Sequence, residues 1–469
     1  MLSLRAAPLL SLLLLAGCVT GPDHTAPDMA LPAKFSEGGN SSTGDVSTVA
    51  WWTAFRDPRL DSLVHKGLDQ NLDVLQALER INAAEAGVDA GGAGALPSLT
   101  GSSAFSRSGS EGTVNAQTPR NTTSGGLNAS WLLDLWGEYR RSKESARATV
   151  DAAYATADVA RLAYLSDLTQ SYINARYYQE RIALARKNLA SRRETLDLTK
   201  LQLEAGAASR LDVVQSEGLV NSTLADIPGL EAQFRASAHH IATLLGLPAS
   251  SLVADLQRGA RQPVAARVPK AGIPADLIRN RPDIRKAERD LAAAVADIGV
   301  AKAKLFPSIT LSGSISPSYI SSPGNSGNLT SWSFGPSLRL PIFDGGALKA
   351  NVDIAESSAR VQYLAWKSTV LKAVEEVENA MTALNRDAQT VNALAATVKS
   401  YEEALALSTS SYRDGASSLL DVLDAQRSVA TAQGSLAQAV QKMALDYVAL
   451  SVATGGGYAV GSAVASKGM

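Results

Sequence analysis

The sequence predicts a mainly helical protein with a smaller β part, because long heptad-patterned segments and short alternating segments both occur twice along its 469 residues. Residues 97–100 (PSLT) return at 307–310 (PSIT), 210 positions later. Residues 206–213 return at 415–422, 209 positions later, with the same Gly, Ser, Leu, Asp and Val. A period near 210 is far longer than the roughly 20–50 residues of a solenoid repeat. We therefore expect two similar halves with one architecture.

Each half opens with a helical pattern that ends at a breaker. In the first half the pattern strengthens from Asn71 and stops at the Gly91-Gly92 cluster before Pro97. In the second it opens at Arg281-Pro282-Asp283, where proline in the first helical turn is well tolerated, and stops before Pro307. Each half is therefore expected to begin with one helix of about 20 residues.

Two segments with a period of two follow each of these helices. In the second half residues 309–316 and 331–340 alternate apolar side chains with serine, glycine and arginine. In the first half residues 127–135 alternate less cleanly, and 99–105 are the weakest of the four. Roughly 10-residue strands with one apolar face are typical of membrane β-barrels, although soluble sandwiches alternate in the same way. The predicted lipid-facing residues are Ile309, Leu311, Ile315, Trp332, Phe334 and Leu338.

The segments between the paired strands are rich in Gly, Ser, Asn, Thr and Pro. We expect loops at Ser108–Gly126 and Ser321–Asn328. Four strands alone cannot close around a channel, whereas strands from several subunits could. If the β part lies in a membrane, the sequence therefore favours an oligomer.

Apolar residues then recur every seven positions on both sides of a glycine. The first half carries this repeat from Leu168 to Leu203 before Gly206, and the second carries it from Val377 to Tyr412 before Gly415. A strict heptad imposes a left-handed supercoil, so each glycine is expected to join two antiparallel coiled-coil helices. The longer helix, from about Tyr139 to Glu204, would extend about 100 Å at ~1.5 Å per residue.

The N-terminal 17 residues form a targeting segment. Arg5 precedes an apolar stretch that is too short to span a bilayer, and Leu15-Ala16-Gly17 leads directly to Cys18. This order resembles the lipobox of bacterial lipoproteins, in which the cysteine is acylated and becomes the mature N-terminus. Cys18 is the only cysteine of the chain, so no intrachain disulfide is possible.

Charge and motif content argue against several functions. The formal net charge is −1 and no basic run stands out, so nucleic acid is not an expected partner. The four histidines show no metal-ligand spacing, and the glycine pairs precede no phosphate-binding lysine and serine. No nucleophile–base set is recognisable. We therefore expect neither an enzyme nor a cofactor or metal site, apart from a covalent diacylglycerol and N-acyl lipid on Cys18.

These features together resemble the outer membrane factor family, the TolC-like ducts, and most closely its NodT-type lipoprotein branch. Nearly the whole mature chain carries the resemblance. Its motifs are Gly21-Pro22-Asp23, Trp51-Trp52, residues 55–60 (FRDPRL), 272–278 (GIPADLI), Arg281-Pro282-Asp283-Ile284, Ile298-Gly299, 306–309 (FPSI), 341–346 (PIFDGG) and 420–427 (LDVLDAQR). Family members carry arginine where this chain has Asn280.

The resemblance implies the assembly and its place in the cell. It implies a homotrimer in the cell outer membrane, lipid-anchored and extending into the periplasm, with a 12-stranded β-barrel and a coiled-coil α-barrel. Such a duct is the passive exit of a tripartite efflux system for drugs or metal ions. Its partners are a periplasmic adaptor protein, an inner-membrane resistance-nodulation-division pump and outer-membrane lipid.

The resemblance also implies an organisation along the chain. The expected segments are 1–17, signal peptide; 18–70, lipidated tether and equatorial segment; 71–247, first efflux repeat; 248–280, linker; 281–456, second efflux repeat; and 457–469, flexible tail.

Two sets of site residues follow from the resemblance. The first is the pair of hairpin tips, which would dock the adaptor. They comprise Gly206, Ala207, Ala208, Ser209 and Asp212, and Gly415, Ala416, Ser417, Ser418 and Asp421. The second is a gate at the periplasmic end, with an Asp424 ring on the three-fold axis and an apolar constriction at Leu420. Arg427 would compensate the Asp424 charge within its own helix or bridge to a neighbour, and Tyr412 would hold the arms closed. Leu420 and Asp424 share a helix face because they are four residues apart.

Two other readings remain open at this point. A duct for type I protein secretion would have the same architecture. A coiled-coil lipoprotein scaffold without a pore would explain the heptads and Cys18, but not four membrane-type strands that recur in pairs.

Overall fold

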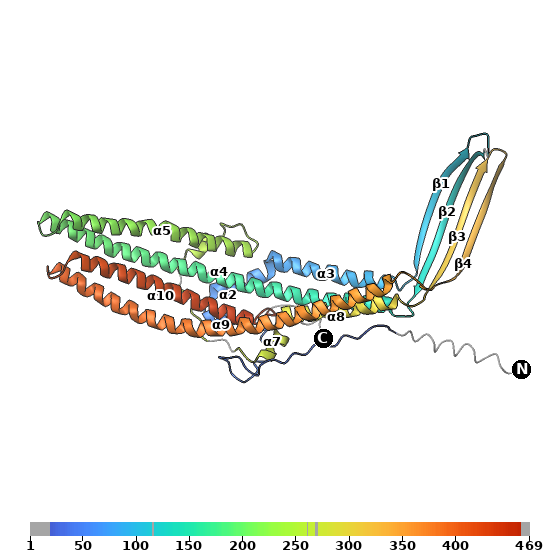
Figure 1. Ribbon diagram of the computed structural model, residues 1–469. Helices are drawn as coiled ribbons and strands as arrows, with labels where there is room; N and C mark the ends of the chain where they lie inside the picture. Colours follow the sequence, from blue (N-terminus) through green and yellow to red (C-terminus); the bar gives the residue numbers. More distant parts are fainter. Residues whose placement is uncertain (1–18, 115–116, 260, 268–270, 461–469) are drawn as a thin grey trace. The chain divides into compact units, whose positions relative to one another are not determined.

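The computed structural model describes residues 19–114, 117–259, 261–267 and 271–460. The order helix, two strands, long helix and returning helix occurs twice, as predicted (Figure 1). The helices are η1 Trp51–Phe55, α2 Pro58–Gln70, α3 Leu72–Ala93, α4 Glu138–Glu204, α5 Arg210–Leu244, α6 Val253–Leu256, α7 Pro274–Asn280, α8 Pro282–Ala303, α9 Ala347–Arg413 and α10 Leu419–Ala453. The strands are β1 Ser98–Ser110, β2 Gln117–Leu133, β3 Ser308–Ser322 and β4 Asn325–Arg339.

The chain divides into two compact units, and each unit takes segments from both halves. We call the first the strand unit; it contains the residues up to Asp28, Arg80–Tyr154 and Lys286–Lys367. We call the second the hairpin unit; it contains Met29–Glu79, Ala155–Arg285 and the residues from Ser368 onward.

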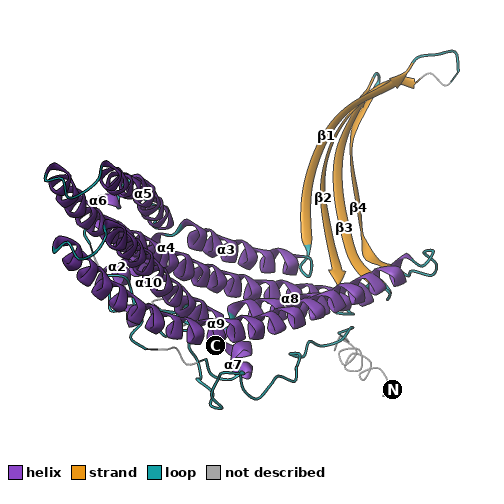
Figure 2. Cartoon of the chain, turned by 60° about the vertical axis from the view of Figure 1, so that its left-hand side comes forward, coloured by secondary structure: helices purple, strands orange, loops and turns teal. Residues whose placement is uncertain are grey.

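The four strands of the strand unit form one antiparallel sheet in the order β1-β2-β3-β4 (Figure 2). The central pair, β2 and β3, joins the two halves, with Trp131 opposite Leu311. In the second half Ile315 lies opposite Trp332. Strands β1 and β4 are the edges of the sheet.

The register sorts the side chains of all four strands into two faces. Residues directly opposite each other in neighbouring strands share a face, and alternate residues along a strand change face. One face is apolar: Leu99 and Phe105 of β1, Leu127, Trp131 and Leu133 of β2, Ile309, Leu311 and Ile315 of β3, and Trp332, Phe334 and Leu338 of β4. The other face carries mainly serine, threonine, asparagine and glycine. All six predicted lipid-facing residues therefore lie on one face.

The predicted loops were largely wrong. Residues 117–126 belong to β2, and β3 and β4 are joined at Pro323-Gly324, where Gly324 has a φ of +82°. The strands contain 13 to 17 residues, more than the predicted ten. These segments were predicted as loops because they are rich in serine, threonine and glycine. In the structure they extend the sheet beyond its apolar band, and composition alone does not distinguish a loop from a polar part of a strand.

The hairpin unit contains two helical hairpins, α4 with α5 and α9 with α10 (Figure 1). Leu189, Leu196, Val213 and Val220 form the core between α4 and α5. Tyr412, Leu419, Val422 and Leu423 form the corresponding core of the second hairpin. Six of these eight residues, all except Leu419 and Leu423, belong to the predicted heptads, and the helical prediction is confirmed.

The N-terminal tether is extended, as predicted, but it is bound along its length. In the strand unit, Arg141 is 3% exposed and its guanidinium donates to the carbonyl of Thr20 (3.0 Å) and to Asp23 (2.7 Å). Gly21 packs so closely on Gly299 that a Cβ at Gly21 would lie 2.5 Å from the Gly299 Cα. The Gly21-Pro22-Asp23 and Ile298-Gly299 motifs are therefore parts of one contact.

In the hairpin unit the tether binds α7. The Asp276 carboxylate, whose residue is 1% exposed, accepts from the Thr43 backbone N–H (3.0 Å), and the Asn280 amide donates to the Gly44 carbonyl (2.9 Å). Asn280 replaces the arginine of the family pattern and still has a structural role.

Candidate functional site

The first hairpin tip is a closed turn between α4 and α5. The N–H groups of Gly206 and Ala207 donate to the carbonyls of Leu203 (3.0 Å) and Gln202 (2.7 Å), and Gly206 has a φ of +74°. This is the Schellman end of a helix, which requires a left-handed residue. Ser209 then caps α5.

The cap of α5 is a reciprocal capping box. The backbone N–H of Ser209 donates to the Asp212 carboxylate (2.8 Å), and the N–H of Asp212 donates to Ser209 Oγ (3.2 Å). The predicted capping role of Ser209 is confirmed, and Asp212 completes it.

The second tip repeats the first almost atom for atom. The N–H groups of Gly415 and Ala416 donate to Tyr412 O (3.1 Å) and Ser411 O (2.8 Å), and Gly415 has a φ of +73°. Ser418 and Asp421 form the same capping box at the start of α10.

The side chains that the tips present outward are small. Ala207 and Ala416 are exposed, and an added Cβ on Gly206 or Gly415 would meet nothing within 4 Å. Ser209, Asp212, Ser418 and Asp421 are used in capping, and Ser417 Oγ donates to the Ser408 carbonyl (3.4 Å). Each tip is therefore a rigid, open surface of backbone and methyl groups.

The predicted gate residues lie on the exposed side of α10. Leu420 is 53% exposed, and the side chains of Asp424 and Arg427 are 61% and 52% exposed. An Arg427 Nη1 lies 2.6 Å from Asp424 Oδ1 within the same helix. Leu420 and Asp424 thus share an uncovered face, as predicted from their spacing.

Tyr412 lies elsewhere: it is 7% exposed and buried between the hairpins. Its hydroxyl is 3.4 Å from Thr199 Oγ1 on α4. One turn farther, Gln426 Nε2 of α10 donates to Thr195 Oγ1 of α4 (2.8 Å). These two contacts form a polar seam that joins the second hairpin to the first.

Sequence reasoning missed Gln426, Thr195 and Thr199, which form the rest of this seam. A signal was present, because Arg192 and Thr199 follow Leu189 and Leu196 by three residues, where a heptad normally has a second apolar residue. Polar residues at such positions specify which helices pair.

Arg192 adds a buried cation beside the seam. It is 9% exposed, and its Nη1 donates to Thr223 Oγ1 of α5. Burial lowers the pKa of the Arg192 guanidinium; Asp226 opposes this effect and the positive charge of Arg427 adds to it. The Arg427 side of α10 therefore lies close to the buried Arg192 of the first hairpin.

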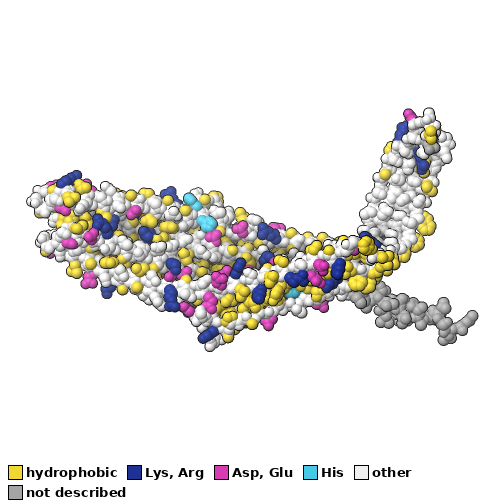
Figure 3. All heavy atoms as spheres, in the orientation of Figure 1, with side chains coloured by type: hydrophobic (Ala, Val, Ile, Leu, Met, Phe, Trp, Pro, Cys, Tyr) yellow, Lys and Arg dark blue, Asp and Glu magenta, His cyan; other side chains and the backbone are white. Residues whose placement is uncertain are grey.

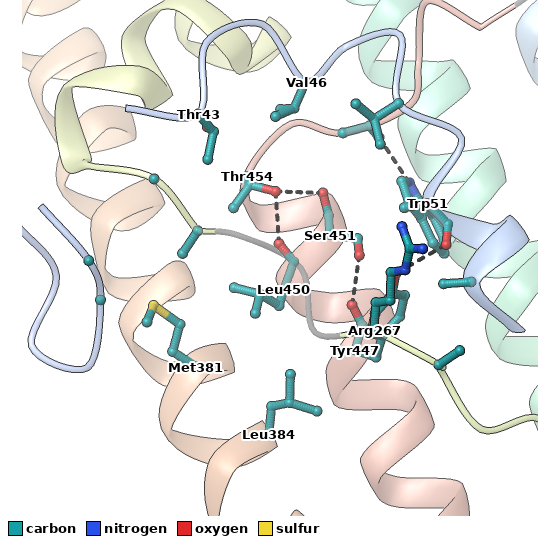
Figure 4. Close-up of a pocket in the computed structure, with 18 of the residues that line it drawn as sticks. Thr43, Val46, Trp51, Arg267, Met381, Leu384, Tyr447, Leu450, Ser451 and Thr454 are labelled. Carbon is teal, nitrogen blue, oxygen red and sulfur yellow. Dashed lines mark hydrogen bonds between the residues drawn. The ribbon is translucent and has the colours of Figure 1, made fainter. Parts of the chain in front are cut away.

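A cavity of about 990 Å³ lies in the hairpin unit among the tether, α9 and α10 (Figure 4). The Tyr447 hydroxyl donates to the Trp51 carbonyl (3.1 Å), and Trp51 Nε1 donates to the Gly456 carbonyl (3.0 Å). Its apolar lining includes Val46, Met381, Leu384 and Leu450. The cavity therefore presents an apolar wall in which these polar groups are already bonded.

Within the residues that the structure describes, no three His, Cys, Asp or Glu side chains are grouped so that they could hold a metal ion. Across the same residues, no helix combines the length and the apolar character that crossing a membrane requires.

The fold, compared with known proteins, is that of the TolC-like outer-membrane efflux channels. The solved outer-membrane channel OprN superposes with a TM-score of 0.83 at 32% identity, over 94% of this chain and 100% of that one. The outer membrane efflux protein family model matches residues 63–247 and 273–456. The chain belongs to this family.

Two curated relatives match over nearly their full length. Nodulation protein T of Rhizobium leguminosarum bv. trifolii is 59% identical over 448 residues, which is 95% of this chain and 96% of that protein. The pyoverdine export outer membrane protein OpmQ of Pseudomonas aeruginosa is 32% identical over 95% of each chain. The predicted fold class, efflux function and outer-membrane location are confirmed.

Proposed function

We propose that three copies of this chain form a passive duct in which their sheets close into a 12-stranded barrel. The supporting observation is the sheet itself, which has one apolar face, one serine-rich face and two open edges. Open strand edges are not viable in lipid, because their N–H and C=O groups would find no partner. Pairing β4 of one copy with β1 of the next removes both edges. The serine-rich face then lines the lumen.

The surface of α9 in the strand unit supports the same assembly. Ile354 and Val361 are seven residues apart and 63% and 61% exposed, and Leu364 is 60% exposed. Figure 3 shows hydrophobic side chains gathered on the helices next to the strands. Heptad-spaced apolar residues that face solvent in one copy are typical of a coiled-coil seam with another.

The oligomeric state tests this proposal. Multi-angle light scattering in mild detergent should give the protein mass of three chains while circular dichroism shows intact helices. A monomeric mass with intact helices would contradict the trimer.

The periplasmic end of the duct is closed by the second hairpin. Asp424 from each copy forms an acidic ring at the axis, with Leu420 one turn earlier as an apolar constriction. The exposure of both side chains in a single copy supports this arrangement. The polar seam of Tyr412 and Gln426 holds the hairpin against α4 in the closed state.

The two tips dock a periplasmic adaptor, which connects the duct to an inner-membrane pump of the resistance-nodulation-division class. The support is their rigid capping together with their small exposed side chains. Energy comes from the pump, and this chain performs no chemistry. The cargo is a small molecule, as the name of the pyoverdine exporter OpmQ suggests for that relative.

Acylation of Cys18 anchors the protein in the outer membrane. Cys18 lies outside the described residues, but the residues that follow it support a fixed anchor. Val19 packs on Gly137 and Thr20 donates to the Trp136 carbonyl (3.1 Å), so the tether is held where β2 meets α4. Labelled palmitate should enter the wild type and not Cys18→Ala; incorporation into the variant would contradict the assignment.

A further inference from the structure

The corner between β2 and α4 is closed by an aromatic contact within the chain. Trp136 follows the end of β2 by three residues and stacks on Phe306 with ring centroids 4.7 Å apart. Its Nε1 donates to the Pro307 carbonyl at 2.7 Å. Phe306 and Pro307 directly precede β3, the strand that pairs with β2. Trp136, which follows β2, therefore packs on the two residues that directly precede β3.

The repeat supplies the same two elements a second time. Residues 130–136 (SWLLDLW) align with 337–343 (SLRLPIF) at an offset of 207, because the second half has two extra residues, Asp344 and Gly345, before Gly346, which matches Gly137 at the offset of 209. This alignment places Phe343 at the position of Trp136. Phe306-Pro307 corresponds to Leu96-Pro97. Phe343 therefore follows β4, and Leu96 precedes β1.

Within one copy these two residues remain uncovered. Phe343 is 91% exposed and Leu96 is 67% exposed, and they flank the two edge strands of the sheet. Large apolar side chains with such exposure at a sheet edge mark an interaction site.

We propose that Phe343 of one copy packs on Leu96 of the next copy, so that the Trp136–Phe306 contact is repeated across the subunit boundary. This inference rests on the proposed trimer and names a contact within it. The occupant is a second copy of this chain, because pairing β4 with β1 continues the antiparallel sheet and brings the end of β4 next to the start of β1. The contact seals the wall of the duct where strands give way to helices.

The repeat limits the register of the new strand pair to within two residues, because Ser98 lies opposite Ser130 whereas its counterpart Ser308 lies opposite Arg339 and not Ser337. Leu133 lies opposite Ile309 and Trp131 opposite Leu311 in the β2–β3 pair. Transferred to the second position, this register places Leu340 opposite Leu99, Leu338 opposite Gly101 and Ser337 opposite Ser102 of the next copy. The apolar face then stays apolar and the serine face stays polar across the boundary, which a shift by one residue would reverse.

Cysteine cross-linking tests the Phe343–Leu96 contact independently of the trimer itself. Under copper-phenanthroline oxidation, Ser337→Cys/Ser102→Cys should yield covalent dimers and trimers on non-reducing gels. Ser337→Cys/Ser108→Cys, displaced by six residues on the same face, should not. Phe343→Cys/Leu96→Cys should give the same ladder as the in-register pair, and each single variant controls for reaction through Cys18.

Each result decides one point. Cross-linking at Ser337/Ser102 without cross-linking at Phe343/Leu96 leaves the trimer standing and overturns the seal. Cross-linking of the displaced pair instead overturns the register. If no pair cross-links and light scattering shows a monomer, the proposed trimer itself fails.

A thermal measurement provides an independent check. Phe343→Ser and Leu96→Ser should each lower the temperature at which the trimer dissociates, and the double variant should be little worse than either single one. Phe343→Trp, which copies the first half of the chain, should retain the wild-type temperature. Fully additive effects of the two serine substitutions would overturn the proposal. So would stronger quenching by brominated lipid in Phe343→Trp than in the wild type, whose Trp131 and Trp332 already lie on the apolar face.

Discussion

The hydroxyl of Tyr412 lies 3.4 Å from Thr199 Oγ1, and this contact connects the last turn of α9 to α4. Thr199 is fully buried and also donates to the Thr195 carbonyl (2.8 Å), while Thr195 Oγ1 accepts from Gln426. The seam therefore consists of neutral hydrogen bonds inside an otherwise apolar interface. Such bonds orient two helices, yet each contributes only about 0.5–1.5 kcal/mol to the free energy of the packed state, so they are easily broken.

Weakening the seam should favour opening. Tyr412→Phe removes one hydroxyl and keeps the ring, so the closed state should lose about 1 kcal/mol and the open probability should rise roughly 5-fold. Gln426→Leu should act in the same direction. Single-channel recording in planar bilayers measures the effect, and Tyr401→Phe, on an exposed residue of the same helix, is the control. Equal open probabilities in Tyr412→Phe and Tyr401→Phe would show that the seam does not gate.

Removing the charge of the proposed Asp424 ring should change conductance and selectivity together. Asp424→Asn keeps the shape and removes the charge, so we expect a larger conductance with weaker preference for cations. Leu420→Ala/Arg427→Ala should widen the same constriction. The matched control is Asp353→Asn, an exposed carboxylate of the strand unit. Unchanged conductance and selectivity in both gate variants would place the constriction elsewhere.

The tips allow docking to be separated from folding. Ala207→Glu and Ala416→Glu place a charge on exposed methyl positions that cap nothing, so efflux should fall while the amount of trimer stays normal. Ser418→Ala removes a cap and should cost about 1 kcal/mol of stability. Drug susceptibility of cells, measured beside trimer levels on gels, distinguishes the two effects. Normal efflux in both glutamate variants would remove the docking assignment.

A carboxylate pair between α9 and α10 should make stability depend on pH. Burial raises the pKa of Asp446 to about 6, and the nearby Asp387 contributes to the rise while Lys442 opposes it. Because this pKa is raised above its usual value, the folded protein binds the proton more tightly, and stability should fall as the pH rises through about 6.

The expected loss between pH 5 and pH 8 is about 1.4 kcal/mol, because about one unit of the pKa shift lies above pH 5 and one pKa unit corresponds to ~1.4 kcal/mol. Asp446→Asn should abolish it, whereas Asp297→Asn, at an exposed position, should not. The readout is the temperature at which helical circular dichroism is lost at each pH. A wild type equally stable at both values would contradict the assignment.

The sequence predicts the helices of this protein far better than its contacts. Heptads and the Gly206 and Gly415 breaks are local signals, so both hairpins and their caps follow from them directly. The lengths of the strands do not follow from local signals, because the serine and glycine residues of β2 that face away from the apolar side resemble a loop. The tether is harder still: Arg141 binds mainly the carbonyl and carboxylate groups of Thr20, Gly21 and Asp23, and carbonyls leave no mark in a sequence.

The same distinction between local signals and long-range contacts applies to the site residues. Asp424 could be named from its motif, and its i,i+4 spacing from Leu420 places both on one helix face. The partner of Tyr412 could not be named, because Thr199 is 213 positions away and its hydroxyl serves an interface between two hairpins. The opposite holds for Phe343, because the repeat identifies its counterpart Trp136 from sequence alone. Its need for a partner becomes visible only from the exposed fraction of its ring in the structure.

The interleaving of the two halves has a consequence for how such a ring can be built. Each compact unit takes segments from both halves, and the central strand pair of the sheet joins one half to the other. A half-length chain would carry one strand pair and one hairpin, so six half-length chains would supply the same elements as three complete ones. Joining halves in pairs leaves the ring size unchanged and lets alternate hairpins diverge. The exposed aspartate at position 424 shows the result, because the residue 209 positions earlier, in the first hairpin, is Gln215.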